Sequence, residues 1–194
     1  MADVAALKVE LISVASQTDN GFEAGGAAVD RIKVLSAALE SANPTPDPAQ
    51  QAEMLRGRWQ LLYSSFGLER ETTLARLSFN VLPKIGVRVN SVWQEVQPER
   101  ALYDNIVECE EGPVIVEGRY AAQSGSRLGV EFYRAFSVLG MDHYDGAIDN
   151  GKIPSLHSDV TFLDRDFRLN RGGFGNLYVL QLIDRSPSVW SRDL

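Results

Sequence analysis

From Gly57 onward, apolar and polar side chains alternate with a period of two, and this pattern constrains the fold more than any other feature of the chain. Turns rich in Gly, Asp and Asn separate the alternating segments, and no pattern of helical length intervenes. The pattern predicts a mainly β protein, an antiparallel barrel or sandwich over residues 57–194. The candidate strands are residues 59–63, 74–81, 87–96, 102–109, 114–120, 128–138, 158–163, 167–171 and 176–183.

The first 42 residues follow a different period. Two apolar stripes repeat at steps of three and four residues, and residues 18–21 (Thr-Asp-Asn-Gly) supply a turn between them. We expect a helical hairpin over residues 1–42, with its first helix over residues 4–16. Residues 43–56 then form a proline-rich linker and a short helix, because Pro44, Pro46 and Pro48 remove backbone donors and favour extended conformations.

The charge and the cysteine count exclude several classes of protein. Nineteen Lys and Arg against 26 Asp and Glu give a net charge of −7, which argues against nonspecific binding of nucleic acid. One cysteine, Cys109, excludes an internal disulfide framework, and two histidines leave little for a metal site. No window has the roughly 18 apolar residues that a membrane span needs. The N-terminal residues lack the features of an import signal, so we expect that none exists or that it has been trimmed.

Two stretches are more specific than the pattern around them. Residues 43–46 (Asn-Pro-Thr-Pro) lead into residues 55–65 (Leu-Arg-Gly-Arg-Trp-Gln-Leu-Leu-Tyr-Ser-Ser), and residues 162–173 (Phe-Leu-Asp-Arg-Asp-Phe-Arg-Leu-Asn-Arg-Gly-Gly) run into 175–180 (Gly-Asn-Leu-Tyr-Val-Leu). Together they resemble the plastid lipid-associated protein family, the fibrillins or plastoglobulins. The middle, residues 66–157, matches only in strand pattern.

The resemblance implies a lipocalin-like antiparallel β-barrel, preceded by the helical hairpin, that binds an apolar molecule in oxygenic phototrophs. It also implies association with thylakoids or plastid lipid globules, a role in photoprotection and no enzymatic activity. Because it apparently lacks a transit peptide, the chain resembles a cyanobacterial member of the family. Such a protein would lie in the cytoplasm, peripheral to the thylakoid. A trimmed plastid protein of the stroma or the plastoglobule gives the same sequence.

A barrel of about eight strands is either filled by its own side chains or holds one small ligand, and the periodicity leaves both open. If a ligand is held, the more apolar face of each strand lines the lumen. Candidate ligands are a lipid, a carotenoid or a prenylquinone, and no other cofactor is expected. The hydroxyls of two tyrosines in this set could meet a ligand head group or be satisfied within the core. The predicted lining residues are Leu61, Tyr63, Val114, Val116, Tyr120, Val130, Phe132, Phe136, Leu177 and Val179, beside Trp59.

Gly57 and Trp59 are similar to the Gly-x-Trp that opens the first strand of lipocalins. Glycine allows a close backbone approach at a barrel corner, and the indole closes the narrow end with a large apolar face. A late arginine, Arg168 or Arg171, is expected to lie over the ring in a cation–π contact. We assign these four residues a structural role as the barrel plug.

Other readings of the sequence stay open. An amphipathic first helix could adsorb to a lipid surface, so that the protein is a structural coat around a filled barrel. Catalysis would need Ser64, Ser65, Cys109, His143 or His157, and nothing in the sequence sets any of them beside an orienting partner. The glycines of residues 171–176 favour a hairpin turn over a phosphate cradle, because a strand follows them. The loop over residues 140–157 has no assigned role.

Overall fold

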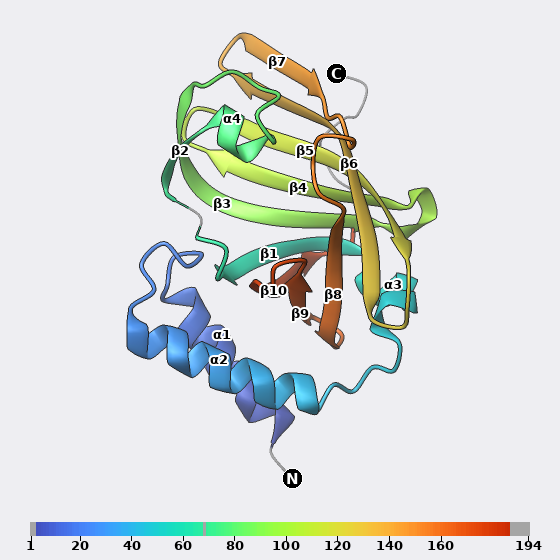
Figure 1. Ribbon diagram of the computed structural model, residues 1–194. Coiled ribbons are helices and arrows are strands. Elements are labelled where there is room, and N and C mark those ends of the chain that lie inside the picture. The colour runs from blue at the N-terminus through green and yellow to red at the C-terminus, as the bar shows by residue number, and fades with distance from the viewer. Residues whose placement is uncertain (1–2, 68, 187–194) are drawn as a thin grey trace.

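The computed structural model describes residues 3–67 and 69–186, and the chain begins with the expected helical hairpin. Helix α1 (Val4–Ser16) and helix α2 (Gly26–Ser41) lie against each other beneath the strands (Figure 1). Asp3 caps α1, since its side chain accepts hydrogen bonds from the amides of Ala5 and Ala6. In the turn, Gly21 has a φ of +97°, and a Cβ there would lie 2.6 Å from the carbonyl oxygen of Ser64. Glycine therefore lets the hairpin turn touch the barrel.

Short helices and strands follow in the remainder of the chain. The helical elements are η1 (Pro48–Gln50), α3 (Ala52–Leu55), α4 (Leu74–Leu77) and η2 (Pro98–Arg100). The strands are β1 (Gly57–Ser64), β2 (Glu71–Thr73), β3 (Gly86–Gln97), β4 (Leu102–Cys109), β5 (Pro113–Ala122), β6 (Arg127–Leu139), β7 (Asp142–Ala147), β8 (Leu156–Leu163), β9 (Phe167–Gly172) and β10 (Leu177–Asp184). The last eight residues of the predicted barrel range, 187–194, lie outside the described residues.

Strand pairing closes into a ring. The hydrogen-bonded order is β1-β10-β9-β8-β6-β5-β4-β3-β2, and β1 also pairs with β3. Every pairing between two of these strands is antiparallel, and β2 and β7 are attached outside the ring to β3 and β6. The prediction of a mainly β protein, with an antiparallel barrel after a helical hairpin, is confirmed.

Two predictions of local structure were wrong. Residues 74–81 form α4 and a turn rather than a strand, because the Thr73 hydroxyl caps the helix at the Arg76 amide. Phe79 and Asn80 then adopt positive φ angles of 55° and 64°, which no strand allows. The unassigned segment after Gly140 contains β7, which pairs with β6 across six residue pairs.

Apolar residues form two large clusters on opposite faces of the strands. The interior cluster has members on β1, β3, β4, β5, β6, β8 and β10. Ala49 and Leu55 extend it at one end of the barrel, and Leu74 and Leu82 extend it at the other. The second cluster lies between the hairpin and the outer faces of β1, β8, β9 and β10. The hairpin thus covers one half of the barrel wall.

Candidate functional site

The apolar interior cluster contains six of the predicted lumen and plug positions. Each belongs to the interior cluster and is at most 9% exposed. Tyr120, a seventh, is half-buried and packs against the same cluster. The six are Trp59, Leu61, Val114, Val116, Val130 and Phe132.

Tyr63, Leu177 and Val179 were assigned to the wrong face. All three belong to the cluster between the barrel and the helical hairpin. In β1 the pairing with β10 shifts between Leu61 and Tyr63, so the alternation breaks there. In β10 both faces are buried, because the hairpin covers the outer one. The more apolar face of that strand is therefore not the inner one.

Phe136 was also assigned to the wrong face, for a different reason. Gly118 of β5 pairs with Phe132, whereas Glu117 pairs with Arg134, so β6 carries one extra residue at Tyr133. A bulge of this kind moves every following side chain to the opposite face. Ala135 consequently joins the interior, and Phe136 lies with Ile106 and Ile115 in a small outer cluster.

Trp59 lies in the interior cluster, between α3 and Arg168. Its side chain is fully buried, and its Nε1 donates a 2.9 Å hydrogen bond to the carbonyl oxygen of Leu55 in α3. The guanidinium of Arg168 lies 4.7 Å from the ring centroid. Arg171 takes no part, because it points outward and binds Glu40 of α2 at 2.9 Å. Of the two candidates, Arg168 is therefore the arginine over the ring.

Gly57 begins β1 in a conformation that a residue with a side chain rarely adopts. Its φ is +127°, and a Cβ would lie 2.5 Å from the carbonyl oxygen of Asp184 in β10. Glycine is required here because the two backbones approach closely at the corner of the barrel.

Polar atoms without partners lie among the apolar walls around Arg168. The Nη2 of Arg168 donates to Gln94 Oε1 at 2.7 Å, and the Tyr103 hydroxyl donates to the same oxygen at 2.7 Å. The Nε and Nη1 of Arg168 have no hydrogen-bond partner, nor do the Oδ1 atoms of Asn105 and Asn170. Complete burial lowers the pKa of Arg168, although the nearby Tyr103 and Tyr120 act in the opposite direction. Sequence reasoning missed Gln94, Asn105 and Asn170, which share the inward phase of their strands with apolar residues.

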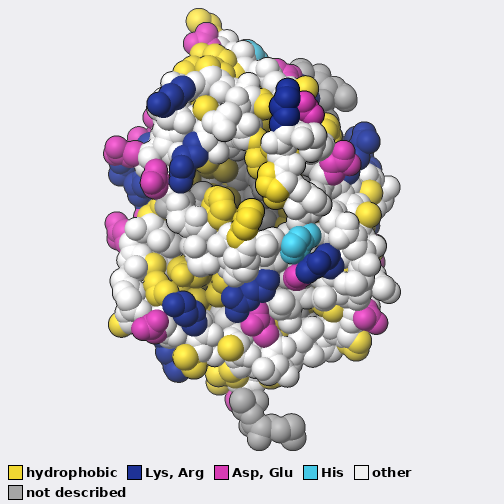
Figure 2. Space-filling model, in the orientation of Figure 1, with side chains coloured by type: hydrophobic (Ala, Val, Ile, Leu, Met, Phe, Trp, Pro, Cys, Tyr) yellow, Lys and Arg dark blue, Asp and Glu magenta, His cyan; other side chains and the backbone are white. Residues whose placement is uncertain are grey.

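A cleft of about 440 Å³ lies where the end of β5, the start of β6 and the segment before β8 meet. Its wall includes Tyr120 and Val130, together with Ile153 and Leu156 from the segment that leads into β8. All four belong to the interior cluster or pack against it. Tyr120 also contacts Tyr103 edge to face, with 6.4 Å between the ring centroids. The face in Figure 2 is hollowed near its centre, and hydrophobic side chains are visible within the hollow.

A second, larger cleft has a different character. It measures about 940 Å³ and lies between β2, α4 and the start of β3. Charged side chains dominate its wall, including Glu71, Arg76, Lys84 and Arg88. An apolar molecule would find few favourable contacts there.

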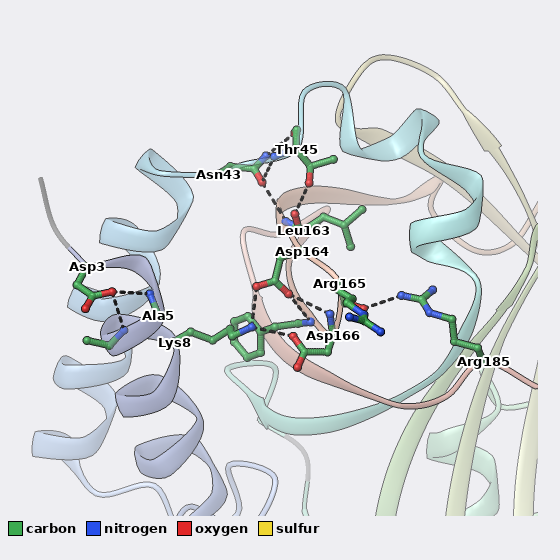
Figure 3. Close-up of polar contacts among 12 residues, drawn as sticks. Asp3, Ala5, Lys8, Asn43, Thr45, Leu163, Asp164, Arg165, Asp166 and Arg185 are labelled. Atoms are coloured by element: carbon green, nitrogen blue, oxygen red, sulfur yellow. Dashed lines mark hydrogen bonds and ion pairs between the residues drawn. The ribbon is translucent and has the colours of Figure 1, made fainter.

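The two stretches that carry the family resemblance meet in space. In Figure 3, Asn43 and Thr45 lie beside Leu163, whose amide donates to Asn43 Oδ1 at 3.0 Å and whose carbonyl oxygen accepts a hydrogen bond from the Thr45 hydroxyl. From α1, Lys8 reaches Asp164 at 2.8 Å and Asp166 at 2.7 Å in the turn between β8 and β9. These contacts attach the hairpin and the linker to the barrel. Sequence reasoning did not find this role for Lys8.

The groups that catalysis would use are held in structural contacts or lie at the surface. The Ser64 hydroxyl accepts a bond from the Phe66 amide, and the Ser65 hydroxyl accepts one from the Leu177 amide. Burial, with a contribution from Glu111, raises the pKa of the Cys109 thiol to about 12. His143 is exposed on β7, and His157 lies 3.8 Å from Asp159.

Two further findings apply to residues 3–67 and 69–186. They contain no group of three or more His, Cys, Asp or Glu side chains placed to hold a metal ion. None of their helices combines the length and the apolar character needed to cross a bilayer.

Comparisons with known proteins agree with this architecture. The chain is 32% identical to plastid-lipid-associated protein 6, chloroplastic, of Arabidopsis thaliana over 56% of its own length and 38% of that protein. Identity to the probable plastid-lipid-associated protein 3, chloroplastic, of the same plant is 35%, over 87% of this chain and 39% of that one. The chromoplast-specific carotenoid-associated protein of Cucumis sativus is 25% identical over 92% of this chain and 68% of its own.

No solved structure matches the chain significantly. Residues 5–181 of this chain match the family model PAP_fibrillin. Since that match covers most of the barrel and the hairpin, the chain belongs to the PAP_fibrillin family of plastid lipid-associated proteins.

Proposed function

We propose that the barrel binds one small hydrophobic molecule without transforming it, and that the protein acts at photosynthetic lipid surfaces in photoprotection. The ligand class is a lipid, a carotenoid or a prenylquinone. The relatives are named as lipid-associated and carotenoid-associated proteins of plastids, which supports this class. By the same proposal the protein is peripheral to a thylakoid in a cyanobacterial cytoplasm, or to a lipid globule if it comes from a plastid.

The observation that carries the proposal is the cleft at Tyr120 and Val130. Its volume of about 440 Å³ falls in the range of roughly 300 to 1,000 Å³ that small-molecule sites occupy. Part of its wall is apolar: Val130 belongs to the interior cluster, and Tyr120, Ile153 and Leu156 pack against that cluster. Polar and charged residues such as Arg119, Glu131 and Asn150 complete the wall, so an amphipathic molecule would find contacts of both kinds.

The alternative, a structural coat, is less well supported. It would place the apolar stripe of α1 against a lipid surface. Leu11 and Ala15 of that stripe are fully buried against α2 and the barrel. Adsorption through the stripe would therefore require the hairpin to detach, which would expose the cluster beneath it.

The test is the recovery of a ligand from the purified protein. The protein is expressed in a photosynthetic host, purified without detergent and extracted with organic solvent for mass spectrometry. We expect one hydrophobic molecule per chain. Val130→Trp, which fills the cleft, should reduce that yield several-fold. Val9→Trp, the same change at a position that is 67% exposed on α1, should leave it unchanged.

Both variants must melt as cooperatively as the parent protein. An extract without a stoichiometric hydrophobic molecule, from protein that still pellets with vesicles, would overturn the proposal in favour of the coat.

A further inference from the structure

Arg168 is a buried cation without a carboxylate partner. Several partly buried arginines, by contrast, have acidic partners: Arg58 binds Glu95, Arg134 binds Glu117, and Arg171 binds Glu40. The printed contacts of Arg168 are one hydrogen bond to a neutral amide and one stack on an indole. A charge buried in this way is strongly unfavourable unless an anion or water compensates it.

The free donors of Arg168 define what could compensate it. A guanidinium carries five N–H donors, and Nε and Nη1 are both buried without an acceptor. Trp59 covers one face of the guanidinium plane, so further partners must approach through the N–H edges. A carboxylate supplies two oxygens and the missing negative charge, whereas a hydrocarbon supplies neither.

The position of Arg168 also defines the rest of the ligand. Side-chain contacts link Arg168 to the cleft wall: Gln94 touches Arg168, Tyr103 touches Gln94, and Tyr120 touches Tyr103 and forms part of that wall. Trp59, on which Arg168 stacks, belongs to the apolar interior cluster with Leu61, Val116 and Phe132. A molecule whose head group bound Arg168 would therefore place the rest of its length against this cluster.

We propose that Arg168 anchors the head group of the barrel ligand and that this ligand is an amphipathic carboxylate, a hydrocarbon chain ending in an acid group. The inference rests on the proposed function, since it names the ligand class of the same barrel. It differs from the plug role because a plug needs only the stack on Trp59, whereas an anchor also uses the free Nε and Nη1.

The experiment compares two probes of equal chain length, oleate and oleyl alcohol, which displace the fluorescent 18-carbon acid cis-parinaric acid. A charge-assisted hydrogen bond contributes roughly 1.5 to 3 kcal/mol, so oleate should bind about tenfold more tightly than the alcohol, or better. Arg168→Met should remove the discrimination while retaining binding of the alcohol. Arg171→Met, on the same strand but paired outward with Glu40, should keep it.

A second measurement uses the unaltered protein, in case Arg168→Met does not fold. The Arg168 Nε–H resonance should shift when oleate is added and stay in place when the alcohol is added. Equal binding of both probes, or an unmoved resonance, would overturn the anchor while leaving the apolar site intact. Failure of both probes to bind, with no lipid in extracts of the purified protein, would instead overturn the proposed function.

Discussion

The two halves of the barrel wall bury their strands differently. Strands β8, β9 and β10, with the end of β1, lie between the interior of the barrel and the helical hairpin, so both of their faces are buried. Strands β3 to β6 carry only a small outer cluster of Trp93, Ile106, Ile115 and Phe136. Alternation therefore identifies the inner face well on the half without helices and poorly on the half that the hairpin covers.

The largest expected effect tests the interior, where the two halves meet. Trp59→Ala should lower the free energy of unfolding by about 3 to 5 kcal/mol, because it removes a fully buried indole with its bond to Leu55 and its stack on Arg168. Trp93→Ala, at the half-buried edge of the outer cluster, should cost much less. Urea unfolding measures both. Equal midpoints for the two variants would contradict the difference between inner and outer faces.

A pair of phenylalanines on β6 tests the bulge at Tyr133. Phe132→Ala and Phe136→Ala should each destabilise the fold, by up to about 3 to 5 kcal/mol for a buried ring. Only Phe132→Ala should alter the lipid recovered from the purified protein, because Phe136 lies in the outer cluster. If both variants change the recovered lipid equally, the assignment of Phe136 to the outer face is wrong.

The helix-covered half is tested by Leu177→Ala. Loss of this buried side chain should cost about 2 to 5 kcal/mol, since the hairpin packs directly on it. Val34→Ala, at a position of α2 that is 59% exposed, should change stability by about 0.5 kcal/mol at most. Thermal unfolding measures the loss of stability of each variant, and mass spectrometry of solvent extracts measures the lipid that it retains. If the Leu177→Ala protein were as stable as the parent but lost its lipid, Leu177 would line the lumen and its assignment to the outer face would be wrong.

The smallest effect concerns the contact of Lys8 with Asp164 and Asp166. Burial alone would lower the pKa of Lys8, but hydrogen bonds to the two aspartates outweigh it and raise that pKa. The bond to Lys8 lowers the pKa of Asp166. Because Asp166 is largely exposed, Lys8→Met should cost only about 0.2 to 1 kcal/mol at neutral pH.

The stability difference between the parent and Lys8→Met should depend on pH, in the way that the pKa shifts of Asp166 and Lys8 indicate. A lowered Asp166 pKa stabilises the fold above the unfolded value of about 3.9, and this stabilisation is lost as the pH falls through the folded value. The raised Lys8 pKa maintains the contact until the pH rises past the folded value of the lysine. Urea unfolding should therefore show a smaller difference in stability between parent and Lys8→Met at pH 2.5 than at pH 7. A difference of the same size at both pH values would mean that Lys8 acts through packing.

Local signals predicted most of the fold. The range of the first helix and the bounds of β4 follow directly from apolar spacing and turn residues. The errors arose where long-range contacts decide the outcome. Nothing near Leu177 indicates that the helical hairpin will cover it, and nothing near Tyr133 indicates an extra residue relative to β5. The polar groups in the interior were missed because Asn105 and Asn170 interrupt the apolar alternation of their strands. The pattern alone does not indicate that such residues point inward.

Ring closure leaves β2 and β7 as the strands attached outside the barrel. Both are short, at three and six residues, and both carry acids: Glu71 on β2, Asp142 and Asp145 on β7. An unpaired strand edge is a template for association with another chain, and short, charged edges resist such pairing. Many copies crowded together could therefore remain separate molecules, without joining edge to edge into fibrils.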